Sequence, residues 1–588
     1  MPERLSPRER AAAFALFALC VALYAARVGE AYAQPALSSD FSYFLPRLLD
    51  GRWWRQVNGA FAVPWFTPAF CGGIPRAVDG QDLTWSIPEA LTRFVDPLRA
   101  MELTGVIAPV VAAAGFARLL SRSFGASGWT SLLGATVVLF NGAHLARTLS
   151  GHLAYHGMMF VPWVCLGVTA PLPDEAAARR RRLVADTLLA GVALAYIAWS
   201  GLLNLLLPML LAIFAVALLR GVMRGGYRDI ALRVISSGVL ALLLGLAKFT
   251  AFIAFFSQFR RDAYPLPGIP GLGGTILAGL RAVFSFPLTF EGASLANSRW
   301  VLEPHEWSYA VGPLPALGML FALGVALRAR RRPRWSRADR LALLCVTTIL
   351  AVPLVVNVYT PGFNALLKRL PVVSSSSNVV RWWLAYVFVA PLGVLGFEAL
   401  PPRTRRMVAL AGVALCAVAF SRLDLARFAR GGYPTAPVRR AWEISHRGLP
   451  PPPITAVSAF AARTLLRNTA LLRGESQRYC YEPSFGYALE RFPRRTLHPG
   501  PITDVTDGAL NLKNPACYLW PAANRCAPGD HFRASQREAM LRFASRRPFA
   551  FEMSAAQRVA NGVTLLAWGA ALVAAGALAA DALRRRRR

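Results

Sequence analysis

Long apolar stretches alternate with short polar segments along most of the chain. A helix needs about 20 predominantly apolar residues to cross the hydrocarbon core of a bilayer, and about twelve stretches approach or reach that length. We therefore predict a polytopic α-helical membrane protein with about twelve transmembrane helices. The predicted spans are 11–28, 101–120, 128–147, 157–171, 183–200, 202–220, 230–256, 309–327, 338–356, 379–399, 406–421 and 559–582.

Composition and charge support the same class. Of the 588 residues, 55% are hydrophobic and 16% are charged, whereas about 25% charged residues is usual in a soluble domain. The net charge of +34 would suit a nucleic-acid-binding protein, but much of the arginine lies in short clusters between apolar stretches. Such clusters are typical of cytoplasmic loops, so we expect no nucleic-acid partner. The clusters lie at 179–182, 328–337, 403–406 and 584–588.

The arginine clusters also predict the orientation. When the N-terminus is placed in the cytoplasm and the spans alternate, every short cytoplasmic connection contains arginine, in agreement with the positive-inside rule. These connections are 121–127, 172–182, 221–229, 328–337 and 400–405, followed by the C-terminal tail. We predict a multi-pass protein of the cytoplasmic (inner) membrane with both termini in the cytoplasm.

The same orientation places the longer polar segments outside, and these predict the domains. We expect a transmembrane domain 1–421 with outer loops 29–100 and 257–308, an extracytoplasmic soluble domain 422–558, and a C-terminal helix with a basic tail, 559–588. The soluble domain contains Cys480, Cys517 and Cys526. Cys517 and Cys526 either form a disulfide, which an oxidising compartment permits, or remain free buried thiols.

Polar residues gather at the outer ends of the predicted spans, where a site on the outer membrane face would lie. Asp40 follows the first span, and Asp79 and Asp82 lie in the loop after it. His152 and His156 are four residues apart, a spacing that places two side chains on one face of an α-helix. Such a pair can bind a metal, or it can belong to an aromatic-rich interfacial segment without a ligand.

A second polar group precedes the eighth predicted span. Glu303, His305 and Glu306 lie within four residues of sequence. Two carboxylates beside a histidine can hold a divalent cation or orient an acceptor hydroxyl. They can equally be solvated loop charges.

Two cations lie at or within predicted spans. Lys248 is inside the seventh span, where a lysine is costly unless it is paired or reaches the interface. It either pairs with a lipid phosphate or extends to the membrane surface. Arg381 opens the tenth span on the outer side, against the positive-inside bias. The planar guanidinium suits bidentate contact with phosphate, so we interpret Arg381 as a phosphate-binding residue.

In their order and spacing, the following short motifs resemble the C-type (GT-C) superfamily of membrane glycosyltransferases, including bacterial YfhO-like membrane proteins. The resemblance extends over most of the membrane domain. The motifs are Asp40 after the first span, residues 64–68 with 72–75, Gly151-His152 leading to 161–163, Glu306 with Tyr309 and Gly312, and Leu370-Pro371 with a serine run leading to Arg381.

The resemblance implies an inverting transfer of a sugar from a polyprenyl-phosphate-linked donor to a glycan or lipid acceptor of the cell envelope. It implies that Asp40 is the general base and that Arg381 and Lys248 bind the lipid phosphate. Some relatives use a divalent cation such as Mg²⁺ or Mn²⁺ and others do not. Candidates for metal or acceptor binding remain open; they are Asp79, Asp82, His152, His156, Glu303 and Glu306.

Two other functions compete with this interpretation. A lipid or glycolipid transporter would more often have repeated halves and broken helices that meet near the membrane midplane. A non-catalytic envelope assembly protein would need no base at all, because a fold alone does not establish activity. The chain contains no nucleotide-binding or zinc-protease motif in a credible context, so a nucleotide substrate is not expected.

Overall fold

The computed structural model describes residues 5–259, 265–298, 301–328, 335–374, 376, 378–459, 466–478 and 497–587. Within these residues, nine helices are long and apolar enough to cross a membrane. The chain is therefore an α-helical, membrane-spanning protein. The nine are Pro7–Tyr32, Pro97–Phe124, Gly128–Ser150, Ala176–Arg224, Tyr227–Gln258, Arg337–Val355, Val380–Ala399, Pro402–Ser421 and Ala555–Arg586.

Each predicted span falls on a helix, although the lengths differ. The spans 183–200 and 202–220 form one helical stretch of 49 residues, Ala176–Arg224. A π-helical turn, η3 (Ala198–Leu202), interrupts it, and Gly201 there has a φ of 91°. The spans 157–171 and 309–327 fall on shorter apolar helices, Leu153–Thr169 and Leu314–Arg328. A further apolar helix, Leu272–Phe284, lies in the predicted outer loop 257–308, where no helix was expected.

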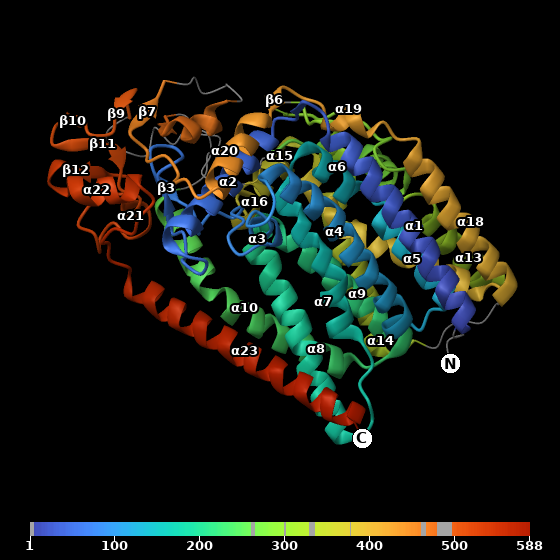
Figure 1. Cartoon of the computed structure of the whole chain (residues 1–588). Coiled ribbons are helices and arrows are strands. Elements are labelled where there is room, and N and C mark those ends of the chain that lie inside the picture. Colours follow the sequence, from blue (N-terminus) through green and yellow to red (C-terminus); the bar gives the residue numbers. More distant parts are fainter. Residues whose placement is uncertain are drawn as a thin grey trace.

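The long helices lie side by side in one bundle, and the N- and C-terminal ends lie at the same end of it (Figure 1). The last helix, α23, belongs to this bundle, because Gln557 Nε2 donates to the carbonyl of Ala247 at 2.9 Å and Trp568 Nε1 to that of Leu244 at 3.2 Å. The helices of the bundle include α1 (Pro7–Tyr32), α4 (Pro97–Arg118), α5 (Gly128–Leu139), α7 (Val161–Thr169), α8 (Ala176–Ile197), α9 (Leu206–Arg224), α10 (Tyr227–Gln258), α13 (Leu314–Arg328), α14 (Arg337–Val355), α17 (Leu384–Val389), α18 (Pro402–Ser421) and α23 (Ala555–Arg587).

Short helices connect the long ones where the sequence supplies caps or prolines. Asn141 accepts from the amide of His144 at 2.9 Å and so begins α6 (Gly142–Ser150). Asp96 caps α4 through the amides of Leu98 and Arg99. Further short elements include α3 (Ile87–Leu91), η2 (Leu153–Phe160), α11 (Leu272–Phe284), α12 (Pro304–Trp307), α15 (Pro361–Leu367), η5 (Val380–Trp383), η6 (Ala390–Ala399), α19 (Leu425–Ala429), α20 (Ala436–His446), α21 (Ala516–Leu519) and α22 (Arg537–Ala544).

The segments 29–100 and 422–558, far apart in sequence, pack on each other at the opposite end of the bundle from the termini (Figure 1). Strand β1 (Ala36–Leu37) pairs antiparallel with β6 (Tyr433–Pro434). The amide of Lys513 donates to the carbonyl of Gly72 at 2.8 Å. The ring of Phe66 lies 4.9 Å from that of Phe551. The two segments therefore share a core.

Two small sheets stand in segment 422–558. One is antiparallel, with the order β10 (Val505–Thr506), β11 (Ala509–Lys513), β12 (His531–Arg533). The other is mixed, with the order β8 (Glu475–Gln477), β7 (Ala456–Ser458), β9 (Gly500–Pro501). Cys517 and Cys526 form a disulfide and are therefore not free buried thiols. Cys480 lies outside the described residues.

Candidate functional site

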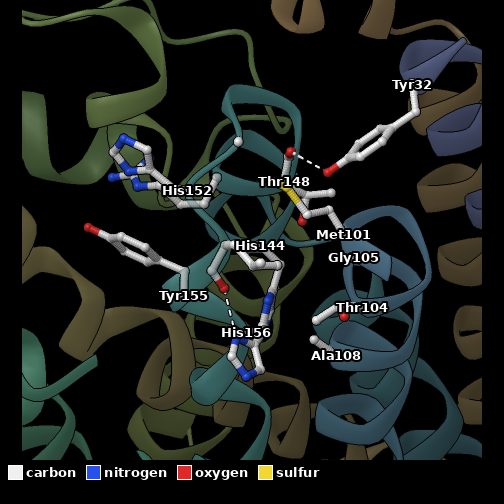
Figure 2. A pocket seen from close by; sticks show the side chains of 13 residues that line it. Tyr32, Met101, Thr104, Gly105, Ala108, His144, Thr148, His152, Tyr155 and His156 are labelled. Atoms are coloured by element: carbon white, nitrogen blue, oxygen red, sulfur yellow. Dashed lines mark hydrogen bonds between the residues drawn. The ribbon is translucent and has the colours of Figure 1, made fainter. Parts of the chain in front are cut away.

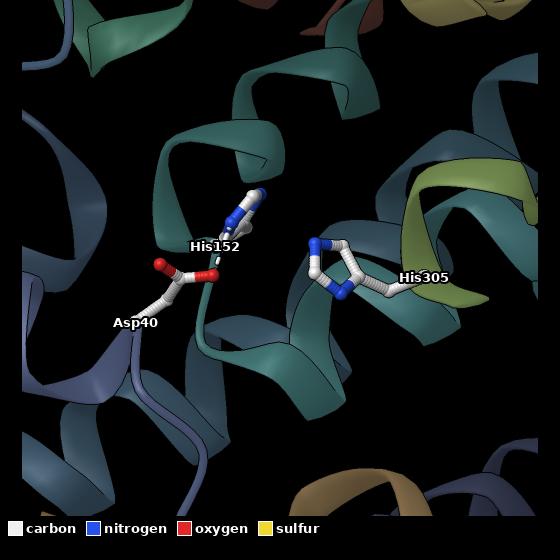
Figure 3. A group of neighbouring side chains, drawn as sticks. All are labelled: Asp40, His152 and His305. Carbon is white, nitrogen blue, oxygen red and sulfur yellow. Dashed lines mark ion pairs between the residues drawn. The ribbon is translucent and has the colours of Figure 1, made fainter. Parts of the chain in front are cut away.

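Asp40 lies directly before α2 (Phe41–Asn58) but does not cap it, since its side chain makes no hydrogen bond to the first helical amides. Its carboxylate instead forms an ion pair with Nε2 of His152 (Figure 3). His152 follows Gly151, which ends α6 in the left-handed conformation with φ 87°. A side chain at Gly151 would place a Cβ atom 2.6 Å from the Phe41 ring. Glycine therefore lets the end of α6 approach the start of α2 and brings His152 to Asp40.

His305 is the third member of this group. It lies on α12, and its ring centre is 4.9 Å from that of His152 (Figure 3). One ligand atom from each of Asp40, His152 and His305 lies within 4.8 Å of the others. Nδ1 of His305 is 3.2 Å from a carboxylate oxygen of Glu303, which orients the ring.

The donor set of Asp40, His152 and His305 decides which cation would fit. Two imidazoles and one carboxylate suit a first-row transition metal such as Mn²⁺ or Zn²⁺. Mg²⁺ favours oxygen ligands and keeps much of its water. The resemblance implies Mg²⁺ or Mn²⁺ as the cation. Of these two, Mn²⁺ fits the donor set of Asp40, His152 and His305, and Mg²⁺ fits it poorly.

Glu306 contacts two arginines, Arg381 and Arg147. Nε of Arg381 donates to Glu306 Oε2 at 3.0 Å, and Nη2 contacts Oε1. Nη2 of Arg147 lies 3.4 Å from Oε2, and Nδ2 of Asn378 donates to the same oxygen at 3.2 Å. Burial works to raise the pKa of Glu306, but Arg381 and Arg147 outweigh it and hold that pKa well below its usual range.

The groups around Asp40 influence one another's charge. Burial works to raise the pKa of Asp40, but the neighbouring His152 outweighs it, and the pKa of this carboxyl is lowered. Burial lowers the pKa of His152 although Asp40 opposes it. Burial also works to lower the pKa of His305, but hydrogen bonds to Glu303 and Glu306 raise it. The neighbouring His152 therefore favours the ionised form of the Asp40 carboxyl.

Arg147 is the functional candidate that the sequence analysis missed. It lies near the end of α6 with about 1% of its side chain exposed. Nη2 donates to the hydroxyl of Tyr309 at 3.2 Å, and the guanidinium lies 5.0 Å from the ring centre of Tyr155. The signal was present: Arg147 ends the predicted span 128–147 on the outer side, as Arg381 opens another there.

Asp79 and Asp82 belong to a different group, within loop 29–100. The hydroxyl of Tyr43 donates to Asp79 at 2.9 Å, and Arg47 Nη1 is 3.7 Å from the same carboxylate. Nε of Arg76 is 3.1 Å from Asp82. Arg76 also lies 3.3 Å from Asp50 and 3.2 Å from Glu89. Both aspartates are thus ion-paired in a buried network within the loop.

His156 does not share a face with His152, so that expectation is wrong. The backbone after His152 is the 3₁₀-helix η2. Such a helix has three residues per turn, so side chains four positions apart lie about 120° from each other around its axis. Nδ1 of His156 lies 2.7 Å from the carbonyl of Leu153, and Nε2 lies 2.9 Å from the hydroxyl of Tyr196. Figure 2 shows the two histidines pointing in different directions from the same stretch of chain.

Lys248 is buried within the bundle. About 2% of the residue is exposed, and Nζ has no hydrogen-bond partner in the described part of the chain. The ammonium lies 5.5 Å from the ring centre of Trp199. Its strongest charge partner is Asp82, followed by Asp79. Lys248 therefore belongs with the loop network and not with Arg381.

The structure thus assembles Asp40, His152, Glu303, His305 and Glu306 with Arg381, and it adds Arg147 to them. Asp79, Asp82, His156 and Lys248 lie in other surroundings. No family model, curated protein or solved structure matches this chain. The geometry of the site is therefore the basis for a functional proposal.

Proposed function

We propose that this chain is a membrane glycosyltransferase of the GT-C type. It would move a sugar from a polyprenyl-phosphate-linked donor to a glycan or lipid acceptor of the cell envelope, on the outer face of the bacterial cytoplasmic membrane. The observation that carries the proposal is the placement of an ionised Asp40 beside His152 and His305, next to two arginines that meet at Glu306. A base and a phosphate-binding group are the two elements that this transfer requires.

In the proposed reaction, Asp40 accepts the proton of the acceptor hydroxyl. The acceptor oxygen forms a bond to the anomeric carbon, and the bond from that carbon to the phosphate oxygen breaks. Polyprenyl phosphate leaves with the electron pair, and the configuration at the carbon is inverted. His152 orients the Asp40 carboxylate through their ion pair.

Arg381 is the proposed contact for the leaving phosphate. About 30% of its side chain is exposed, so it is accessible while it contacts Glu306. Fixed positive charge stabilises the negative charge that develops on a leaving group. Lys248 is left out of this role, because its ammonium is buried against Trp199.

Asp40, His152 and His305 would hold a divalent cation if one is used. The chemistry supplied by a bound cation is neutralisation of phosphate charge.

The proposed topology keeps about twelve crossings: the long stretch Ala176–Arg224 counts as two, and the shorter apolar helices Leu153–Thr169 and Leu314–Arg328 are added to the other long ones. It places both termini in the cytoplasm and the segments 29–100 and 422–558 outside, the latter as the main part of a small soluble domain. Cysteine oxidation supports this placement. Cys71, Cys517 and Cys526 are disulfide-bonded, which is typical of an oxidising compartment. The free cysteines Cys20, Cys165, Cys345 and Cys416 all lie in apolar helices.

Substitution of the proposed base tests the function. We expect purified protein in nanodiscs to release polyprenyl phosphate from a polyprenyl-phosphate sugar when a cell-envelope acceptor is added. Asp40→Asn should lower the rate by about 10²–10⁴-fold, the usual contribution of a general base. Asp96→Asn is the matched control, because Asp96 caps α4 and lies apart from the site. Equal rates for the two variants would rule out Asp40 as the base.

A further inference from the structure

Two runs of arginine, far apart in the sequence, meet at the end of the bundle that carries both termini. Residues 179–182 lie in the first two turns of α8, and residues 584–586 lie in the last turn of α23. Nε of Arg181 lies 3.8 Å and Nε of Arg585 lies 2.9 Å from the same carboxylate oxygen of Asp581. Figure 1 shows the C-terminal end of α23 beside the start of α8.

An apolar contact within the bundle brings the two helices together. Ala195 of α8, Leu244 of α10 and Ala571 of α23 are buried in one small core. Outside this core the two helices stay apolar: Leu572 of α23 is 69% exposed and Val184 of α8 is 40% exposed. Both helices are long and apolar enough to cross a membrane, so these side chains are open to the acyl chains of lipids.

The carboxylates near the two runs do not neutralise them. Four of the arginines form ion pairs with three aspartates: Arg179 with Asp229, Arg182 with Asp186, and both Arg181 and Arg585 with Asp581. Arg180, Arg584 and Arg586 are exposed and have no ion pair in the described part of the chain. Like charges held this close repel one another, so an anion bound here would stabilise the contact between α8 and α23.

The position of the arginines favours the head group of a phospholipid. Basic clusters at the ends of transmembrane helices attract the acidic lipids of the adjacent leaflet. An arginine without an ion pair is present on each helix, Arg180 on α8 and Arg584 on α23. A lipid with two phosphates could therefore contact both helices at once, whereas a lipid with one phosphate would contact one of them.

We propose that residues 179–182 and 584–586 form a binding site for an acidic phospholipid that carries two phosphates. The phosphates bind the arginines of both runs, and the acyl chains lie along α8 and α23. The lipid holds α23 to the bundle. Only 11% of the most apolar stretch of α23 is buried, the lowest share among the nine long helices of the described residues. The site goes beyond the proposed glycosyltransferase function and does not depend on it.

Native mass spectrometry of the full chain in detergent counts bound lipids and so tests the site. The probes are cardiolipin, which carries two phosphates, phosphatidylglycerol, which carries one, and phosphatidylcholine, which has no net charge. We expect cardiolipin to bind about tenfold more tightly than phosphatidylglycerol, because it engages both helices at once, and phosphatidylcholine to bind most weakly. Equal affinity for the two acidic lipids would overturn a site built from both runs.

A triple variant, Arg180→Gln with Arg584→Gln and Arg586→Gln, removes the arginines that have no ion pair. It should weaken cardiolipin binding by about a hundredfold, since each arginine near an acidic membrane surface contributes a factor of roughly five. These side chains are exposed, so we expect the variant to fold. Unchanged binding would contradict the proposal.

The matched control replaces three other exposed arginines, at the starts of α14 and α18, and lowers the net charge by the same amount. They are Arg337, Arg340 and Arg403, each changed to glutamine. This control should bind cardiolipin as the wild type does. An equal loss in both triple variants would mean that the lipid responds to net charge alone, and it would overturn the site.

Amide hydrogen exchange gives a second readout. Cardiolipin should slow exchange in the last turns of α23 in the wild type and in the control, but not in the triple variant that lacks Arg180. Unchanged exchange in the wild type at saturating cardiolipin would contradict the role of the lipid in holding α23. Neither measurement depends on sugar transfer, because α2, which follows Asp40, lies at the other end of the bundle (Figure 1).

Discussion

Burial shifts the pKa values of both Asp40 and His152, and each residue opposes the shift of the other. A carboxylate removed from water is driven toward its neutral form, and the ion pair with His152 reverses that tendency. The pKa of His152 is itself lowered, because the burial of its ring outweighs the opposing effect of Asp40. The result is a carboxyl whose ionised form is favoured, which is the charge state that a general base needs.

His152→Gln should reverse the pH dependence that Asp40 gives to stability. In the wild type the lowered pKa of Asp40 stabilises the fold above the unfolded value of about 3.9, and this is lost as the pH falls through the folded pKa. Without His152, burial raises the pKa of Asp40, and the buried carboxylate costs stability until it is protonated. The free energy of unfolding of the variant should therefore be lower than that of the wild type by roughly 1–3 kcal/mol at pH 7. This difference should shrink as the pH falls toward about 4.

Thermal unfolding in detergent from pH 4 to 8, with a chelator present, measures this difference. His156→Gln is the control, because His156 is also buried but contacts Tyr196 and not Asp40. A stability difference for His152→Gln that stays constant with pH would contradict the assignment.

At the residue level the sequence predicted the chemical types better than the partners. Asp40, Glu306 and Arg381 stood out because each is a charge at the outer end of an apolar stretch. Their partners depend on how α6 ends at Gly151 and on where α12 packs, which no spacing in the sequence reveals. His152 and His156 show the limit most clearly: the spacing fits an α-helix, but the chain forms a 3₁₀-helix there.

Among the elements, α2 connects the candidate site with segment 422–558. It begins directly after Asp40, and at its middle Asp50 accepts from Nε of Arg546 at 2.9 Å. Arg546 also donates to the carbonyl of Pro452 at 2.9 Å and lies 4.8 Å above the Trp53 ring. It does so from a left-handed backbone, φ 58°. Such a conformation in a buried arginine persists only where surrounding contacts fix it.

Arg546→Met should loosen the contact between α2 and segment 422–558. Removing one partner of a buried ion pair costs about 3–5 kcal/mol of stability. We expect the lower end of this range, because Asp50 still contacts Arg76 and Thr67 in the variant. Faster amide hydrogen exchange in α2 and α22 would report the loss. Arg547→Met, at the exposed neighbouring position, should leave exchange unchanged, and equal exchange in both variants would contradict a linking role.

The sequence predicted helices where it carries long apolar runs, because length and hydropathy are local properties. It could not predict that loop 29–100 and segment 422–558 share a core, since the contact between Gly72 and Lys513 joins residues hundreds of positions apart. The helix α11 was also missed. Its 13 residues are too few to span a bilayer, so the length criterion passes over it.

Across the whole molecule, helices α2 and α6 next to the candidate site and helix α21, which carries the disulfide-bonded Cys517, lie away from the end of the bundle that carries both termini (Figure 1). The basic connections predicted to be cytoplasmic include 221–229, with Arg224 and Arg228, at the turn between α9 and α10. If this polarity matches the membrane, the site faces the compartment in which disulfides form and lipid-linked sugars are used.

Reporter insertions test that orientation directly. Alkaline phosphatase folds only outside the cytoplasm, because it needs disulfides, whereas green fluorescent protein fluoresces when it folds in the cytoplasm. We expect phosphatase inserted at Gly448, an exposed turn after α20, to be active. Phosphatase inserted between Gly225 and Gly226, where no neighbouring atom crowds either glycine, should be inactive, and a fluorescent protein at the same position or after Arg588 should fluoresce. The reverse pattern would place Asp40 on the cytoplasmic side, and a polyprenyl-phosphate donor used on the outer face could not then reach it.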